Sequence, residues 1–165
     1  MDEPARAFRR ALSGYATGVA VISATRPRGD QGGEMCGITV NSFASVSLEP
    51  PLVLWCLGDK SERRDVFEAA ETWGVTILRA GEEALARRYA KPESEVLAPH
   101  EAEDFAGAPV LKAGIIHFAC RTHERRPAGD HLIIIGEVAA HRVLAGDALT
   151  FFRGRYGAAP DQENT

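Results

Sequence analysis

The sequence lacks features that several common protein classes require. Its three cysteines, Cys36, Cys56 and Cys120, lie far apart, so neither a disulfide framework nor a zinc-binding pair is indicated. We interpret them as reduced thiols of a cytoplasmic protein. No apolar run reaches membrane length, and no basic segment precedes an apolar one at the N-terminus. The sequence therefore predicts a soluble protein that is not exported.

Basic residues are not in excess. Lysine and arginine number 19 against 23 acidic residues, which gives a net charge of -4 at pH 7. Nucleic-acid binding needs a clustered basic surface that displaces counterions, so we expect no nucleic-acid partner. A chain of 165 residues suits one domain with a core. We predict a single domain over residues 1–157 and a frayed tail at 158–165.

Several catalytic motifs are absent. No G-x-G-x-x-G or G-x-x-x-x-G-K-[ST] occurs, so a nicotinamide would have to be held by something other than a Rossmann domain. His123-Glu124 begins like a zinc-protease motif, but Pro127 stands where the second histidine belongs. No G-x-S-x-G elbow is present. The sequence gives no support for a metal site or for covalent catalysis.

The stretch from residue 37 to 57 organises the chain. Its second half, 52–57, is an apolar run behind Pro50-Pro51 and predicts a strand buried on both faces. Its first half holds short polar side chains, which are Thr39, Asn41, Ser42, Ser45 and Ser47. Small donors at the mouth of a strand let a flat heterocycle approach the backbone. We hypothesise that this stretch binds a planar cofactor.

The N-terminal part predicts a helix and a β-hairpin. Residues 4–14 carry Phe8, Leu12 and Tyr15 at helical spacing, and we expect this stripe to pack while the arginines between face water. Strands at 17–25 and 35–40 should pair antiparallel through the loop between them.

The remainder predicts two helices and further hairpins. The expected elements are helices at 62–71 and 82–90, a strand at 73–78, an irregular excursion at 91–107, and long strands at 110–121 and 131–143 joined by a turn at 124–130. Continuous apolarity at 132–135 predicts coverage of both faces, as in a barrel or at a subunit interface. Six or seven strands with three short helices predict an α+β, mainly β fold with an antiparallel barrel core.

Two further places suggest ligand chemistry. Ser61, Lys60, Arg63 and Arg64 at the start of helix 62–71 form a candidate phosphate seat, with ordinary capping and solvated charge as the alternative. His131 follows the Gly129-Asp130 turn, where its side chain can reach over a bound ring. The other strand histidines, His117, His123 and His141, are interpreted as structural.

Three segments resemble the flavin reductase family of split-barrel FMN-binding proteins, the reductase partners of two-component flavin-dependent monooxygenases. The segments are Gly37-Ile38-Thr39-Val40-Asn41-Ser42-Phe43 with residues 45–54, Gly129-Asp130-His131 with Gly136-Glu137-Val138, and Phe152-Arg153-Gly154-Arg155-Tyr156. The resemblance extends from about residue 8 to 156. Residues 123–131 are similar to actinomycete members that serve aromatic polyketide oxygenases.

The resemblance implies a fold, an activity and partners. The fold would be an antiparallel Greek-key split β-barrel with short flanking helices, assembled as a homodimer with flavin sites near the interface. The activity would be reduction of FMN (or FAD) by NADH or NADPH, with release of reduced flavin to a separate oxygenase. A non-catalytic flavin-binding module, and an oxidoreductase that retains its flavin and acts on an organic substrate, remain alternatives.

The resemblance also implies site residues. Flavin contacts would come from Thr39, Val40, Asn41, Ser42, Phe43, Ser45, Ser47 and Cys56, with Ser61 and Arg88 at the phosphate. His131 is the candidate catalytic residue. It would orient the nicotinamide together with Arg155 and Tyr156.

Overall fold

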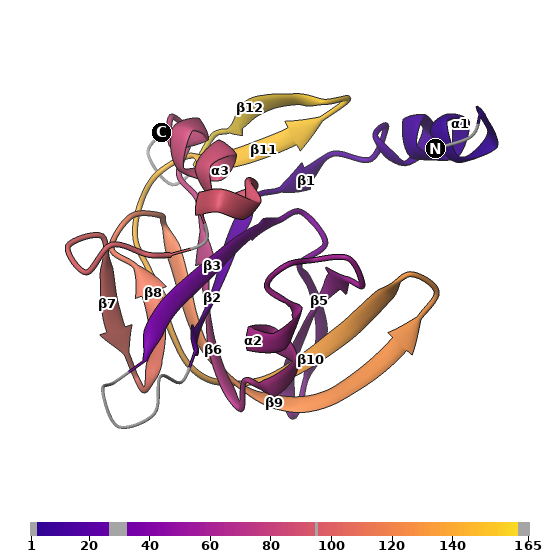
Figure 1. The fold of residues 1–165 in the computed structure, drawn as a ribbon. Coiled ribbons are helices and arrows are strands. Elements are labelled where there is room, and N and C mark those ends of the chain that lie inside the picture. Colours follow the sequence, from indigo (N-terminus) through magenta and orange to yellow (C-terminus); the bar gives the residue numbers. More distant parts are fainter. Residues whose placement is uncertain (1–2, 27–32, 95, 162–165) are drawn as a thin grey trace.

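The computed structural model describes residues 3–26, 33–94 and 96–161. Its main element is a seven-stranded antiparallel sheet (Figure 1). The strand order is β3 (Glu34–Val40), β2 (Ala20–Arg26), β6 (Thr72–Ile77), β9 (Ile116–Ala128), β10 (His131–Val143), β5 (Pro51–Gly58) and β4 (Ala44–Leu48). The mainly β architecture agrees with the prediction, and the β2–β3 hairpin forms as expected, although its loop at 27–32 lies outside the described residues.

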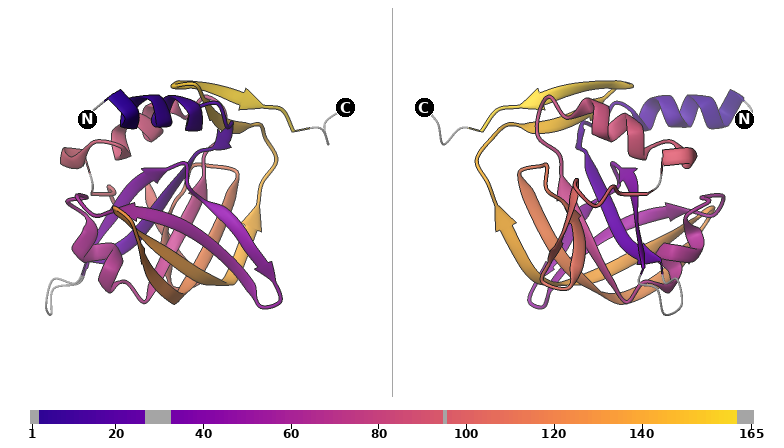
Figure 2. Two further views of the ribbon diagram at one scale, coloured as in Figure 1. Left: turned by 90° about the vertical axis from the view of Figure 1, so that its right-hand side faces the viewer. Right: turned by 60° about the vertical axis from the view of Figure 1, so that its left-hand side comes forward.

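Two smaller sheets and short helices complete the fold. The sheets are β1 (Thr17–Gly18), β11 (Ala148–Phe152) and β12 (Arg155–Ala159), and β7 (Ala102–Phe105) with β8 (Ala108–Leu111). Figure 2 shows the three-stranded sheet at one end of the molecule, beside α1 and α3. The helices are α1 (Glu3–Leu12), α2 (Arg64–Ala69), α3 (Glu83–Tyr89) and the 3-10 turn Pro92–Ser94. No helix in the described part of the chain is long and apolar enough to span a membrane.

The core of the main sheet is built around three aromatic rings. Trp55 lies edge-on to Phe67 and to Trp73, with ring centroids 5.1 and 6.1 Å apart. All three side chains are at most 1% exposed. Helix α2 therefore closes one side of the sheet through Phe67 and its neighbour Val66, as its predicted apolar side requires.

The β5–β10 pair is covered on one face only. Val53, Trp55 and Leu57 are buried, while Leu54 and Cys56 between them are half-buried. Strand β10 alternates in the same way from Leu132 onward. The single chain therefore does not bury both faces of 52–57 as predicted, because continuous apolar sequence does not reveal which face the chain itself can cover. Coverage of 132–135 at a subunit interface stays a prediction.

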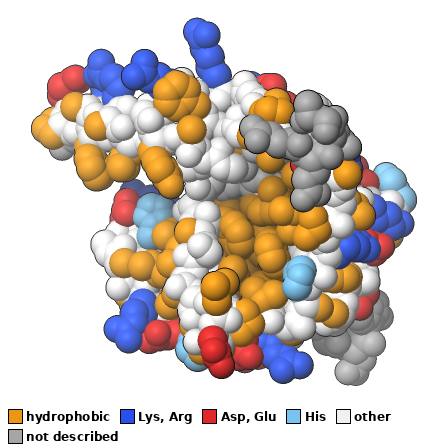
Figure 3. Space-filling view, turned by 180° about the vertical axis from the view of Figure 1, so that it is seen from behind, with side chains coloured by type: hydrophobic (Ala, Val, Ile, Leu, Met, Phe, Trp, Pro, Cys, Tyr) orange, Lys and Arg blue, Asp and Glu red, His pale blue; other side chains and the backbone are white. Residues whose placement is uncertain are grey.

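Helix α1 forms nearly where predicted, but its apolar stripe does not pack on the chain. It has no buried residue, and Phe8, Leu12 and Tyr15 are 67%, 58% and 77% exposed. The helix projects from the body in Figure 1. Figure 3 shows hydrophobic side chains gathered at the centre of the rear face, below this helix. An amphipathic pattern predicts an apolar face correctly but not the surface that covers it.

Three boundaries differ from the prediction. Strand β9 continues to Ala128, so the turn to β10 is only Gly129-Asp130 rather than 124–130. The strand expected at 110–121 is broken at Gly114, whose φ of +90° favours glycine, and its two parts are β8 and β9. The excursion at 91–107 contains β7, and β12 extends to Ala159 instead of fraying after 157; residues 162–165 lie outside the described part.

Candidate functional site

The start of β10 lies against the end of β5. His131 pairs with Gly58, and the Asp59 amide donates to the Asp130 carbonyl over 3.0 Å. A Cβ added to Gly58 would lie 3.7 Å from His131 Nε2, so the strand leaves the ring room. The fold thus brings His131 beside residues 58–61, although 70 residues of sequence separate them, because β10 and β5 are antiparallel neighbours.

His131 is oriented by its neighbour in the turn. Its Nδ1 lies 2.7 Å from Asp130 Oδ1, which leaves Nε2 facing Gly58. This hydrogen bond and the charge of His131 lower the pKa of the Asp130 carboxyl. The His131 side chain is 48% exposed, so the ring is accessible to a ligand.

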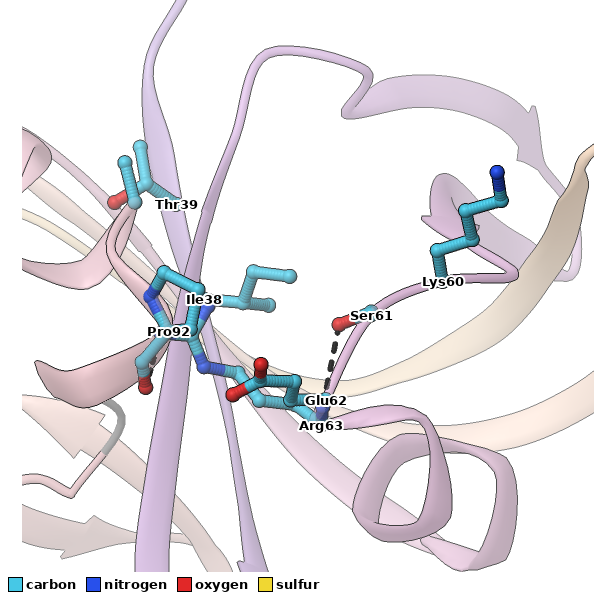
Figure 4. Close-up of a pocket in the computed structure, with 8 residues that line it drawn as sticks. Ile38, Thr39, Lys60, Ser61, Glu62, Arg63 and Pro92 are labelled. Carbon is cyan, nitrogen blue, oxygen red and sulfur yellow. Dashed lines mark hydrogen bonds between the residues drawn. The ribbon is translucent and has the colours of Figure 1, made fainter.

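A cavity of about 260 Å³ opens beside residues 58–61. It is lined by Ile38, Thr39, Lys60, Ser61, Glu62, Arg63, Ala90 and Pro92. Figure 4 shows Thr39 and Pro92 on one side of the view and Lys60 on the other. This volume suits a phosphate and part of a sugar chain rather than a whole drug-sized ligand, whose pockets reach about 300–1,000 Å³.

Ser61 and Lys60 keep hydrogen-bonding capacity for an anion in this cavity. The Ser61 hydroxyl oxygen accepts from the Arg63 amide over 3.3 Å, shown dashed in Figure 4, so its proton is free to donate. No acidic group in the described part of the chain forms an ion pair with Lys60. These two adjacent residues are therefore the donors best placed for a phosphate.

The neighbouring arginines have other partners. Arg63 is 4% exposed, and its guanidinium donates to the carbonyls of Lys91 and Pro92. Arg64 pairs with Asp59 and, over 2.9 Å, with Glu68, and these two carboxylates raise its pKa. Arg63 thus fixes the segment after α3 against the cavity, and Arg64 is neutralised by acids.

The polar segment 39–47 is tied to the structure through some of its hydroxyls. Thr39 donates to the Ala86 carbonyl over 2.8 Å, and the Ser42 oxygen accepts from the Cys56 amide over 3.0 Å. Ser47 accepts from the Glu49 amide over 3.2 Å. These bonds hold Thr39 against α3 and Ser42 against β5, and Thr39 is the residue of the segment that lines the cavity.

The other predicted flavin contacts differ in accessibility. Asn41 and Ser45 are exposed and have free side chains for a ligand. Val40 is 9% exposed and packs in the core, so its side chain is not accessible to a ligand. Phe43 is half-buried, with its ring centroid 5.7 Å from that of Phe118. Cys56 is half-buried, and burial raises the pKa of its thiol against the opposing effect of its contact with Ser42.

Arg88 is committed to an acid. One of its terminal nitrogens lies 2.8 Å from both carboxylate oxygens of Glu101. Tyr89 beside it is buried, and burial followed by the Glu101 charge raises its pKa to about 12. Arg88 is absent from the lining of the 260 Å³ cavity, so the structure does not bring it to the predicted phosphate seat at Ser61.

Arg155 and Tyr156 lie apart from His131 in the chain. They belong to β12 of the three-stranded sheet, whereas His131 begins β10 of the main sheet. The Tyr156 ring packs 5.1 Å from Phe151 and lies under Arg87 at 5.0 Å. Figure 1 shows the β11–β12 turn at the top of the view and the β9–β10 turn lower, both on its right-hand side. The structure therefore divides the predicted nicotinamide contacts into two places.

Lys60, Ser61 and Arg63 of the predicted phosphate seat line the cavity, whereas some of its other lining residues were not predicted. Ala90 and Pro92 carry no local signal, since the position of α3 alone brings them to the cavity. In the described residues, no group of three or more His, Cys, Asp or Glu side chains could hold a metal ion.

Relatives of known activity match nearly the whole chain. The chain is 41% identical over 157 residues to the FMN reductase (NADH) SmoA of Agrobacterium fabrum, covering 94% of this chain and 86% of that protein. It is 39% identical over 137 residues to the actinorhodin polyketide dimerase of Streptomyces coelicolor, covering 82% and 75%.

Solved structures match over a similar length. The flavin reductase of the styrene monooxygenase from Pseudomonas putida S12 has a TM-score of 0.82 and 30% identity, covering 93% of this chain and 97% of that one. The NADH:FAD oxidoreductase SgcE6 of Streptomyces globisporus has a TM-score of 0.84 and 34% identity, covering 98% and 97%. Residues 12–160 match the flavin reductase like domain, which confirms the resemblance found in the sequence. The chain belongs to the flavin reductase like family.

Proposed function

We propose that this chain is an NAD(P)H:flavin oxidoreductase that reduces FMN or FAD and passes the reduced flavin to a separate monooxygenase. The observation that carries the proposal is that three features lie at the end of β5. They are Ser42 bonded to the Cys56 amide, the Ser61 cavity, which Thr39 also lines, and His131 paired with Gly58. These parts offer a polar wall, a phosphate seat and an accessible imidazole, while Ser45 and Ser47 lie farther away, opposite Val53 and Leu52.

The relatives support this activity through what they are named for. SmoA is an FMN reductase using NADH, and SgcE6 is an NADH:FAD oxidoreductase. The Pseudomonas putida S12 protein is named as the flavin reductase of a styrene monooxygenase. We therefore propose NADH as the first reductant to test, a flavin as the acceptor and an oxygenase as the partner. A single domain with a Greek-key split-barrel fold in the cytoplasm is part of this proposal.

The residues present fit a flavin. Ser61 and Lys60 would hold its phosphate, because one has a free hydroxyl proton and the other an unpaired ammonium. The isoalloxazine would lie along the 39–47 segment, where Asn41, Ser45 and backbone groups are accessible and Cys56 forms part of the adjoining half-buried face. The flavin supplies the hydride acceptor when it is bound.

The protein contributes position and polarity to this reaction. His131, held by Asp130, would orient the nicotinamide so that its C4 lies within about 3–3.5 Å of the acceptor atom. Backbone amides of the 39–47 segment would stabilise the negative charge that develops on the reduced ring. His131 needs no proton transfer in this role.

The test is steady-state oxidation of NADH and NADPH by purified protein with FMN or FAD. Protein-dependent oxidation with at least one pair is expected. An unchanged background rate with all four pairs would refute the proposal. Saturable flavin binding without turnover would instead identify a non-catalytic flavin-binding module. Retention of reduced flavin through gel filtration would favour an oxidoreductase that acts directly on an organic substrate.

We also propose a homodimer. The half-buried face of β5 and β10 and the exposed stripe of α1 are both apolar, and contiguous exposed apolar surface marks interaction sites. Figure 3 shows them on the same side of the molecule. Light scattering should give twice the chain mass, and Phe8→Ser with Leu12→Ser should shift it toward the monomer. A monomeric wild-type protein would overturn this part.

A further inference from the structure

The cavity at Ser61 contains an acidic side chain beside the donors assigned to the phosphate. Glu62 lines it together with Lys60 and Ser61. In Figure 4 the Glu62 carboxylate lies on the side of Ile38 and Pro92, apart from Lys60. An ionised carboxylate accepts hydrogen bonds but donates none, so it cannot bond to the oxygens of a phosphate dianion. The cavity therefore combines groups that attract a phosphate with one that repels it.

Glu62 has no cationic partner within the described residues 3–26, 33–94 and 96–161. Each of the other acids in residues 59–68 has an arginine partner; the pairs are Asp59 and Glu68 with Arg64, and Asp65 with Arg26. An exposed carboxylate without a partner is ordinarily only solvated. This one lines the cavity that a phosphate would occupy, so its charge acts on the ligand.

The charges around the cavity are not those of a strong anion site. Residues 59–68 carry four acidic and three basic side chains, in a chain of net charge -4. Arg63 donates to backbone carbonyls, and Arg64 pairs with acids. Lys60 supplies the accessible positive charge, and Glu62 opposes it. The cavity should therefore bind a phosphate more weakly than its donors alone would.

The repulsion acts over a short distance. A roughly spherical cavity of about 260 Å³ is about 8 Å across, which is close to the Debye length of about 8 Å at physiological ionic strength. Salt therefore screens the interaction between Glu62 and a phosphate only in part. The phosphate group of a monoester carries nearly two negative charges at pH 7, which doubles the repulsion relative to a single charge.

We propose that Glu62 sets the affinity for flavin, because its carboxylate repels the flavin phosphate and keeps the flavin exchangeable. This inference rests on the proposed function, in which reduced flavin leaves for a separate oxygenase. The contacts that bind the phosphate of the oxidised flavin also hold that of the reduced product. A site with donors alone would retain the product longer, and repulsion by Glu62 shortens its residence.

The first experiment is fluorescence titration of FMN and riboflavin into the wild type, Glu62→Gln and Glu49→Gln. Glutamine keeps the length of the side chain and removes its charge, so Glu62→Gln should bind FMN about three- to tenfold more tightly. Riboflavin has no phosphate, and its affinity should not change. Glu49→Gln is the matched control. Glu49 is exposed and has no ion pair in the part of the chain that the structure describes, but it precedes β5, whereas the cavity follows that strand.

Salt dependence separates an effect of charge from an effect of shape. At about 1 M salt the Debye length falls to about 3 Å, so the FMN affinities of the wild type and Glu62→Gln should converge. An effect of altered shape would persist at every salt concentration and would contradict the proposal. At low salt, stopped-flow measurements should show slower dissociation of FMN from Glu62→Gln, and an unchanged dissociation rate would overturn the proposed role in exchange.

The titrations can overturn the proposal in three further ways. Equal FMN affinity in the wild type and Glu62→Gln would show that the carboxylate does not act on the phosphate. Tighter binding of riboflavin by the same factor as FMN would place the effect elsewhere than at the phosphate. Weaker binding of both ligands would instead make Glu62 an acceptor for hydroxyl groups of the ribityl chain.

The two proposals fail separately. Titration needs no turnover, so the effect of Glu62→Gln can be measured in a protein that oxidises neither NADH nor NADPH. Conversely, a Glu62→Gln protein with normal turnover and unchanged FMN affinity would refute only the role of Glu62.

Discussion

The two faces of the β5–β10 pair are both apolar in sequence but differ in burial. On the inner face, Trp55, Leu57 and Ile134 are at most 1% exposed. On the outer face, Leu54 and Ile133 are only half-buried. Burial of the inner face stabilises the folded chain, whereas the single chain leaves the outer face partly exposed to solvent. The difference indicates that apolarity of the outer face serves a ligand or a second copy of the chain.

The largest effect should come from the inner face. Trp55→Ala removes a ring packed on Phe67 and Trp73 and should lower the free energy of unfolding by about 3–5 kcal/mol. Urea denaturation monitored by circular dichroism measures it. Ile133→Ala on the outer face should cost clearly less at protein concentrations where the chain is monomeric. Equal losses would remove the distinction between the faces.

Two glycines sharpen the comparison. A Cβ at Gly136 would lie 2.3 Å from Trp73 Cζ2, so Gly136→Ala should destabilise the fold by about 1–3 kcal/mol. A Cβ at Gly58 would lie 3.7 Å from His131 Nε2, so Gly58→Ala should change stability by less than about 0.5 kcal/mol. Gly58→Ala should nevertheless raise the KM for NADH by crowding His131. Thermal melts and kinetics on both variants test whether Gly136→Ala affects stability and Gly58→Ala affects the KM for NADH. A destabilised Gly58→Ala protein with a normal KM would contradict this expectation.

The phosphate seat should affect binding more than folding. Lys60→Ala with Ser61→Ala should weaken FMN affinity about tenfold through lost charge-assisted hydrogen bonds. Its Tm should fall only slightly, because the Arg63 amide loses the Ser61 hydroxyl as acceptor. Riboflavin has no phosphate, so its affinity should not change. Fluorescence titration measures both ligands, with Lys112→Ala as an exposed control away from the cavity. Parallel losses for FMN and riboflavin would place the defect elsewhere than at the phosphate.

The smallest effect concerns the reactivity of two thiols, the buried Cys120 and the half-buried Cys56. Burial raises the pKa of Cys120 to about 12, whereas Cys56 is half-buried and its pKa is raised in the same direction. A raised pKa lowers the thiolate fraction at any pH below it, so both thiols should react slowly near pH 8. A disulfide reagent should modify Cys56 first and Cys120 only on unfolding, and bound flavin should slow Cys56. Mass spectrometry of the labelled peptides distinguishes the sites.

Local patterns in the sequence predict much of the fold. Proline and glycine boundaries, β-branched runs and the apolar side of residues 62–71 gave strands and helices close to those observed. The extent of the β9–β10 hairpin was mispredicted because Arg125 and Arg126 look like turn residues but pair with Ile134 and Ile133. Charged residues on an exposed hairpin have the same composition as a loop, so their sequence pattern does not distinguish the two.

The candidate site was predictable only in part. The serine-rich segment, Ser61 and His131 are local signals, and the structure brings Ser42, Ser61 and His131 to one end of β5. Ser45 and Ser47 lie toward its other end, opposite Val53 and Leu52. The pairing of Arg88 with Glu101, and the separation of Tyr156 from His131, depend on tertiary contacts between distant residues. The pattern of one sequence does not contain such contacts, so it could not show that Arg88 pairs with an acid or that Tyr156 lies apart from His131.

Hydrogen–deuterium exchange with and without FMN tests the central claim most directly. Slower exchange is expected in residues 39–47 and 58–61 when FMN is bound. The amides around Ser42 and Phe43, which lie between β3 and β4, should show the clearest effect. FMN binding that leaves both 39–47 and 58–61 unprotected would contradict the account.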